Sequence, residues 1–175
     1  MENSLKSSVI TLYAMKQVIA DVDKTKQAIQ LCQRGEFERA RKILVEIEQV
    51  QGLNDETCII MGSVLGQLGQ YEGALGYFQR AIELAPDKMQ AYVGQAKTLI
   101  SLGRNMEAEA CFEPLIKRQS GSVGATLQLA TMLLNHDLYE AAERRFLQVL
   151  QQDGDSSTAL SGLGRVYQAL RKSEL

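Results

Sequence analysis

The chain has 175 residues, with 19 Lys and Arg against 21 Asp and Glu, which gives a formal net charge of −2. This charge is too small to attract nucleic acid or acidic lipid by bulk electrostatics, so we expect no nucleic-acid partner. A hydrophobic fraction of 45% and a charged fraction of 23% exclude a disordered or collagen-like chain and predict one globular domain.

The cysteines and the N-terminal residues indicate the compartment. Cys32, Cys58 and Cys111 form no CxxC pair and lie in apolar stretches, which predicts buried, reduced thiols. The first residues lack the apolar core and the cleavage site of a signal peptide. No stretch reaches the roughly 18 apolar residues that a membrane span needs. We therefore expect a cytoplasmic protein without a membrane span.

Residues 1–20 are predicted to form an amphipathic helix that caps the elements after it. Leu5, Val9, Leu12 and Ile19 fall along one helical stripe. The same segment could instead cover a binding surface or form a tail. Its two lysines are too few to favour attachment to a membrane surface.

A 34-residue period organises the chain from residue 21 onward. In the clearest copy, the residues at fixed offsets are Gly69, Tyr71, Ala74, Phe78, Ala81 and Pro86. Shifting the frame by 34 residues in either direction finds a glycine, an alanine and a large apolar residue in the same slots. In the fourth copy Asp137 occupies the glycine slot, and we expect Asn135 to supply the left-handed turn residue instead.

Each repeat is predicted to be a helix, a turn and a second helix. Upstream of each glycine slot an apolar stripe recurs with the i, i+3, i+4, i+7 spacing of one helix face, best seen at Cys58, Met61, Gly62 and Leu65. The four repeats occupy residues 21–54, 55–88, 89–122 and 123–156. The expected helices cover residues 21–34 and 37–50, 55–68 and 71–85, 88–102 and 105–118, and 122–136 and 139–152. Small residues such as Gly62 and Ala74 are expected where the two helices of a hairpin approach closely.

Residues 157–175 restate the first-helix stripe once more, at Leu160, Leu163, Gly164 and Tyr167. They are predicted to be the first helix of a fifth repeat. This helix either caps the array or marks the point at which a longer protein is truncated after Leu175.

The period and its slots resemble the tetratricopeptide repeat family over about residues 21–172. The resemblance implies an all-α, right-handed superhelical solenoid of antiparallel helix hairpins. It also implies a non-catalytic scaffold or adaptor whose first helices line a concave groove for a protein or peptide partner. Rotating off the core stripe by one residue gives the candidate groove residues: Ile59, Ser63, Val93, Lys97, Leu127, Thr131, Ser161 and Arg165. Because this set is apolar or neutral apart from two cations, an extended peptide with apolar side chains is the expected ligand.

Two other functions are compatible with the sequence. A small secretion-type chaperone would combine an N-terminal helix with tandem repeats, and the array could also be the targeting part of a larger enzyme. The single His136 is expected in an exposed turn, and no spacing of residues suggests a metal site or a phosphate-binding loop. We therefore predict no enzymatic activity, no metal and no cofactor. Self-association is left open.

Overall fold

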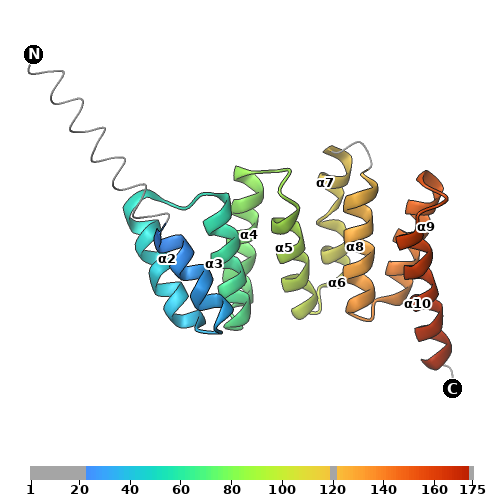
Figure 1. The fold of residues 1–175 in the computed structure, drawn as a ribbon, viewed down its shortest axis with the longest axis horizontal. Coiled ribbons are helices and arrows are strands. Elements are labelled where there is room, and N and C mark those ends of the chain that lie inside the picture. Colours follow the sequence, from blue (N-terminus) through green and yellow to red (C-terminus); the bar gives the residue numbers. More distant parts are fainter. Residues whose placement is uncertain (1–22, 119–121, 174–175) are drawn as a thin grey trace, which may run out of the picture.

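The computed structural model describes residues 23–118 and 122–173 (Figure 1). The helices stand side by side in a row that begins at residue 23 and ends with α10 at the opposite end. The amphipathic helix predicted within residues 1–20 lies outside the described residues.

The helices alternate along the chain as successive antiparallel hairpins. Residues 23–33 are helical and precede α2 (Phe37–Gln51). The elements after them are α3 (Asp55–Gln67), α4 (Tyr71–Leu84), α5 (Met89–Ser101), α6 (Asn105–Ala110), α7 (Glu113–Arg118), α8 (Val123–Asn135), α9 (Tyr139–Gln152) and α10 (Ser157–Ser173). The predicted all-α solenoid of hairpins is thereby confirmed.

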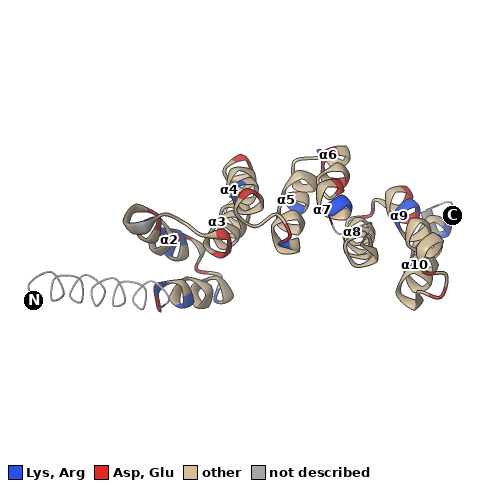
Figure 2. Ribbon diagram, turned by 90° about the horizontal axis from the view of Figure 1, so that it is seen from above, with Lys and Arg blue, Asp and Glu red and all other residues tan. Residues whose placement is uncertain are grey.

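The two helices of each hairpin lie on different sides of the array. We call residues 23–33, α3, α5, α8 and α10 the first helices, and α2, α4, α6 with α7, and α9 the second helices. Figure 2, viewed from above, places the first helices along one side of the row and the second helices along the other. Along the first side, α3 contacts α5, α5 contacts α8, and α8 contacts α10. Four of the first helices, α3, α5, α8 and α10, therefore form one continuous face.

A left-handed residue links the helices within each hairpin. Gly35, Gly69 and Gly103 have φ angles of 75°, 74° and 74°. In the fourth hairpin Asp137 itself has φ 60°, whereas Asn135 ends α8, so the prediction for Asn135 is wrong. The backbone N–H of Asp137 donates to the Leu134 carbonyl oxygen at 3.2 Å, as the N–H of Gly103 does to Ile100 at 2.8 Å. The turn geometry fixes which position is left-handed, and aspartate tolerates it.

The second helix of the third repeat is broken, where the sequence predicts one helix over residues 105–118. α6 ends at Ala110, a turn occupies Cys111 and Phe112, and α7 begins at Glu113. Pro114 explains the break, because it has no N–H to donate to the Ala110 carbonyl and its ring collides with that carbonyl in a regular helix.

Two hydrophobic clusters fill the interior of the array. One gathers buried residues between positions 28 and 91, and the other gathers those between 92 and 166. Ile82 on α4 packs against both clusters. Gly62 is buried with the ring of Phe78 against it, which confirms the predicted close approach of the two helices in that hairpin. The stacking of hairpins thus supplies a core that no single hairpin could form.

The three cysteines are free thiols, but they are not equally buried. Cys58 is buried as predicted, while Cys32 and Cys111 are only partly buried. The prediction of buried thiols is therefore wrong for two of the three. His136 is exposed in the turn after α8, as predicted.

Residues 23–118 and 122–173 contain neither a helix suited to a membrane nor a cluster suited to a metal. None of the helices there combines the length and apolarity needed to cross a bilayer. In the same ranges, no three His, Cys, Asp or Glu side chains gather in a way that could hold a metal ion.

Candidate functional site

The eight candidate groove residues fall in pairs on the first helices. Within each pair the two residues are four positions apart, so they lie on the same face of their helix. The pairs are Ile59 and Ser63 on α3, Val93 and Lys97 on α5, Leu127 and Thr131 on α8, and Ser161 and Arg165 on α10. Because these helices contact one another in order, the pairs form two rows across the array. We call this surface the first-helix face.

The apolar row of the first-helix face is made by Ile59, Val93 and Leu127. Ile59 packs against the first hydrophobic cluster, and Val93 and Leu127 pack against the second. All three nevertheless keep part of their side chains exposed. These residues therefore contribute to the core and also leave apolar surface available to a partner.

The polar row is mostly exposed to solvent. Ser63, Lys97 and Arg165 are exposed, while Thr131 is partly buried. The Ser63 hydroxyl donates to the Ile59 carbonyl oxygen at 2.9 Å, so it has only acceptor capacity left for a partner. The eight residues include two cations and no acid, while the exposed Glu56 lies on the same face of α3. Acidic or carbonyl groups of a partner are therefore favoured near Lys97 and Arg165, away from Glu56.

At the α10 end of the first-helix face the structure brings Thr131, Ser161 and Arg165 together. They line an open cavity of about 470 Å³. The other residues of its wall are Phe146, Ser157, Thr158 and Gly162. Nη2 of Arg165 donates to Oδ1 of Asn135 at 3.3 Å, which holds the guanidinium beside α8. This wall offers four hydroxyl groups and one cation over the edge of a phenylalanine ring.

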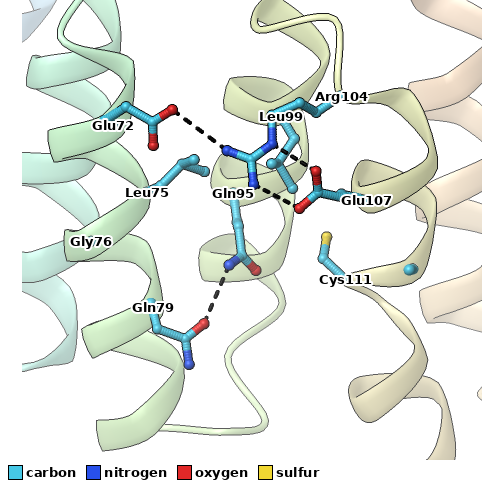
Figure 3. Close-up of a pocket in the computed structure, with 10 residues that line it drawn as sticks. Glu72, Leu75, Gly76, Gln79, Gln95, Leu99, Arg104, Glu107 and Cys111 are labelled. Carbon is cyan, nitrogen blue, oxygen red and sulfur yellow. Dashed lines mark hydrogen bonds and ion pairs between the residues drawn. The ribbon is translucent and has the colours of Figure 1, made fainter.

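A second cavity, of about 600 Å³, opens between second helices and was missed by the sequence analysis (Figure 3). Its wall consists of Glu72, Leu75, Gly76 and Gln79 from α4, Gln95 and Leu99 from α5, Arg104, Glu107 and Ala110, and Cys111. The sequence signal that could have pointed to this cavity is Gly76, a glycine in the middle of a helix. In the structure a Cβ added at Gly76 would meet no atom within 4 Å. Gly76 therefore borders open space.

Arg104 bridges the two sides of this second cavity. Its Nη2 lies 2.7 Å from the Glu107 carboxylate, and its Nη1 lies 3.5 Å from that of Glu72 (Figure 3). The hydrogen bond from Arg104 lowers the pKa of Glu107. Below this bridge, Nε2 of Gln95 donates to Oε1 of Gln79 at 3.3 Å. These bonds join α4 to α5 and to the start of α6. The polar residues in the wall of this cavity therefore hold neighbouring helices together.

A sequence match to a known family covers the middle of the chain. Residues 67–130 match the family model described as tetratricopeptide repeat. This segment of the chain therefore carries tetratricopeptide repeats. An uncharacterized protein of Methanocaldococcus jannaschii is 45% identical over 51 residues, which are 29% of this chain and 59% of that protein. This chain thus covers less than two thirds of that relative.

Solved tetratricopeptide repeat proteins share the fold at low identity. One from Parabacteroides merdae aligns with a TM-score of 0.62 and 16% identity, over 83% of this chain and 58% of the other. A thermophilic one from Thermus thermophilus aligns with a TM-score of 0.61 and 15% identity, over 86% of this chain and 82% of the other. YrrB, described as a tetratricopeptide repeat protein with an unusual peptide-binding site, aligns with a TM-score of 0.57 and 20% identity, over 81% of this chain and 73% of the other. These likenesses show that the chain shares the solenoid fold of tetratricopeptide repeat proteins.

Proposed function

We propose that this protein is a scaffold or adaptor that binds an extended segment of another protein on its first-helix face. The supporting observation is that Ile59, Val93 and Leu127, spaced 34 residues apart, all stay partly exposed while packed against the core. Their backbones are held by rigid helices, so a partner would meet a preformed apolar row and would need to order only itself.

The charged residues suggest what else the partner segment carries. Lys97 and Arg165 are exposed on two helices of the same face. A segment with apolar side chains at intervals, and with a carboxylate or an unpaired carbonyl near Arg165, complements both rows. Each exposed cation contributes only modestly, because solvent and salt screen it. The apolar row is therefore expected to supply most of the affinity.

The test selects ligands from a library of random peptides displayed on phage, with the full-length protein immobilised. Fluorescence anisotropy then measures how each selected peptide binds to wild type and to variants. Leu127→Asp should remove most of the binding, because it places an unpaired charge against apolar side chains. Leu147→Asp is the matched control, since Leu147 is exposed on a second helix, α9; it should bind as wild type does.

The polar row is tested with the same selected peptides. Replacing Lys97 and Arg165 together by Ala should weaken binding modestly and flatten its dependence on salt concentration. Circular dichroism checks that each variant is folded. If folded Leu127→Asp binds as tightly as wild type, or if no peptide is selected, the first-helix face is not a peptide site.

A further inference from the structure

One stripe of α10 lacks the cover that its counterparts have in the other repeats. Leu160 and Tyr167 are 53% and 49% exposed, and a Cβ placed on Gly164, between them, would meet no atom within 4 Å. Each residue of the stripe has a counterpart 34, 68 and 102 residues earlier in the chain. For Leu160 the counterparts are Thr126, Tyr92 and Cys58. For Gly164 they are Ala130, Ala96 and Gly62, and for Tyr167 they are Leu133, Leu99 and Leu65. All nine are buried. The hydroxyl of Tyr167 donates to Oε1 of Glu143 on α9 at 2.7 Å. The apolar surface of the stripe is nevertheless left without a covering helix among the described residues, unlike that of its counterparts.

The stripe extends as a regular seam along the whole helix. Ser157, Leu160, Gly164, Tyr167 and Arg171 follow one another at intervals of three, four, three and four residues. This is the spacing with which one helix presents a straight seam to another. Gly164 lies at its centre, and a large apolar residue stands on each side. If two such helices cross antiparallel at Gly164, each Leu160 faces the Tyr167 of the other copy.

We propose that the open seam of α10 binds the α10 of a second copy of this chain, antiparallel and centred on Gly164. The glycine allows the two backbones to approach closely, and the large residues on either side fill the space next to the crossing. Along the seam a large residue, a small residue and a large residue follow one another, at Leu160, Gly164 and Tyr167. This order is the same when the helix is read in reverse, so two antiparallel copies present the same order to each other. A symmetric pair of this kind needs only one surface, used twice.

The charges at the two ends of α10 select the antiparallel orientation. Asp153 and Asp155 precede the helix, and Arg171 lies near its C-terminal end; all three are exposed. In the antiparallel pair each Arg171 lies over the Asp155 end of the other copy, and the helix dipoles oppose each other. A parallel pair would instead place arginine beside arginine and carboxylate beside carboxylate.

The seam shares Ser157 with the cavity at the α10 end of the first-helix face, but none of the eight residues of that face belongs to the seam. The test of this inference reads the mass of the protein, so its outcome is distinct from that of the peptide-binding test. Sedimentation equilibrium of the full chain at micromolar concentration should give twice the 19.4 kDa of one chain. Leu160→Glu should raise the dimer dissociation constant by about tenfold or more. Leu84→Glu is the matched control, because Leu84 on α4 is also 53% exposed; it should leave the dimer unchanged.

Disulfide formation tests the register. Gly164→Cys should form a covalent dimer quickly under mild oxidation, because the two residues at position 164 meet at the crossing. Gly76→Cys, at an equally open glycine on α4, should form none faster than wild type does. A wild-type mass of one chain, as expected if residues 1–20 or another segment covers the seam, overturns the proposal. Equal rates for the two cysteine variants overturn it as well.

Discussion

A Cβ atom placed on Gly94 would lie 2.2 Å from Cε1 of Phe78. The same ring lies 2.9 Å from the place where a Cβ of Gly62 would be. Phe78 on α4 is therefore packed between α3 of its own repeat and α5 of the next. The contact recurs two repeats later, where a Cβ on Gly162 would lie 2.3 Å from Cζ of Phe146. A phenylalanine of one repeat thus packs against a glycine of the next repeat at two interfaces of the array.

Gly94→Ala should lower the free energy of unfolding by about 1–3 kcal/mol, because the added methyl group displaces a buried ring that has no free space around it. Gly76→Ala, in the middle of α4 and next to open space, should raise it by about 0.5–1 kcal/mol through the better helix propensity of alanine. Urea denaturation of both variants measures the two changes. Equal effects would contradict the assigned packing of Phe78.

Arg145 on α9 should matter more than its neighbour Arg144. Nη2 of Arg145 lies 3.0 Å from the Glu109 carboxylate and 2.8 Å from that of Glu113, and its side chain is only 14% exposed. Arg145→Ala is expected to cost about 1–2 kcal/mol of stability, because it removes the largely buried cation that bridges Glu109 and Glu113. Arg144 contacts the same Glu109 but is 63% exposed. Arg144→Ala should therefore cost less than about 0.5 kcal/mol, and comparable losses in thermal unfolding would refute this distinction.

Cys111 should resist alkylation. Although Cys111 is only partly buried, desolvation raises the pKa of its thiol to about 12, so almost none of it is thiolate near neutral pH. Its Sγ lies 3.2 Å from the Ala108 carbonyl oxygen, to which the thiol donates. Iodoacetamide labelling of the folded protein at mildly alkaline pH, followed by peptide mass spectrometry, should leave Cys111 unmodified until the chain is unfolded. Rapid labelling of Cys111 in the folded protein would show that this environment is wrong.

Asp55 at the start of α3 should make stability depend on acid pH. The hydrogen bond from Lys88, whose Nζ lies 2.8 Å away, lowers the pKa of Asp55 from its ordinary value of 3.8. The stabilisation is therefore complete above about pH 3.8 and is lost as pH falls through the lower pKa of the folded state. Asp55→Asn should remove this part of the acid dependence in unfolding experiments across that range. An unchanged pH profile would mean that the pair does not form in solution.

The sequence predicts the hairpins and their order well, because the same spacing of apolar residues recurs in each repeat. It fails where one residue decides a local geometry. Pro114 breaks the second helix of the third repeat, although the apolar period continues across it. Asp137 adopts the left-handed conformation although Asn135 has a similar tolerance for it, because position 137 is where the turn closes.

The candidate site is only partly predictable from sequence. Helical periodicity places Ile59, Val93 and Leu127 on one face, but it cannot tell how much of each side chain the neighbouring helix covers. The cavity lined by Thr131, Ser161 and Arg165 depends on the distance between α8 and α10. That distance is set by the side chains packed between repeats, which a period does not specify. The repeat boundaries, the chaperone and targeting alternatives and the cytoplasmic location stay predictions.

The most direct test of the proposed function is methyl NMR of the full-length protein during titration with a peptide selected on it. Binding on the first-helix face should shift the methyl signals of Ile59, Val93 and Leu127. The methyl signals of Leu84 and Leu147, which are exposed on second helices, should stay in place. The opposite pattern, with Leu84 and Leu147 shifting while the three first-helix residues do not, would place the partner on the second helices and contradict the proposal.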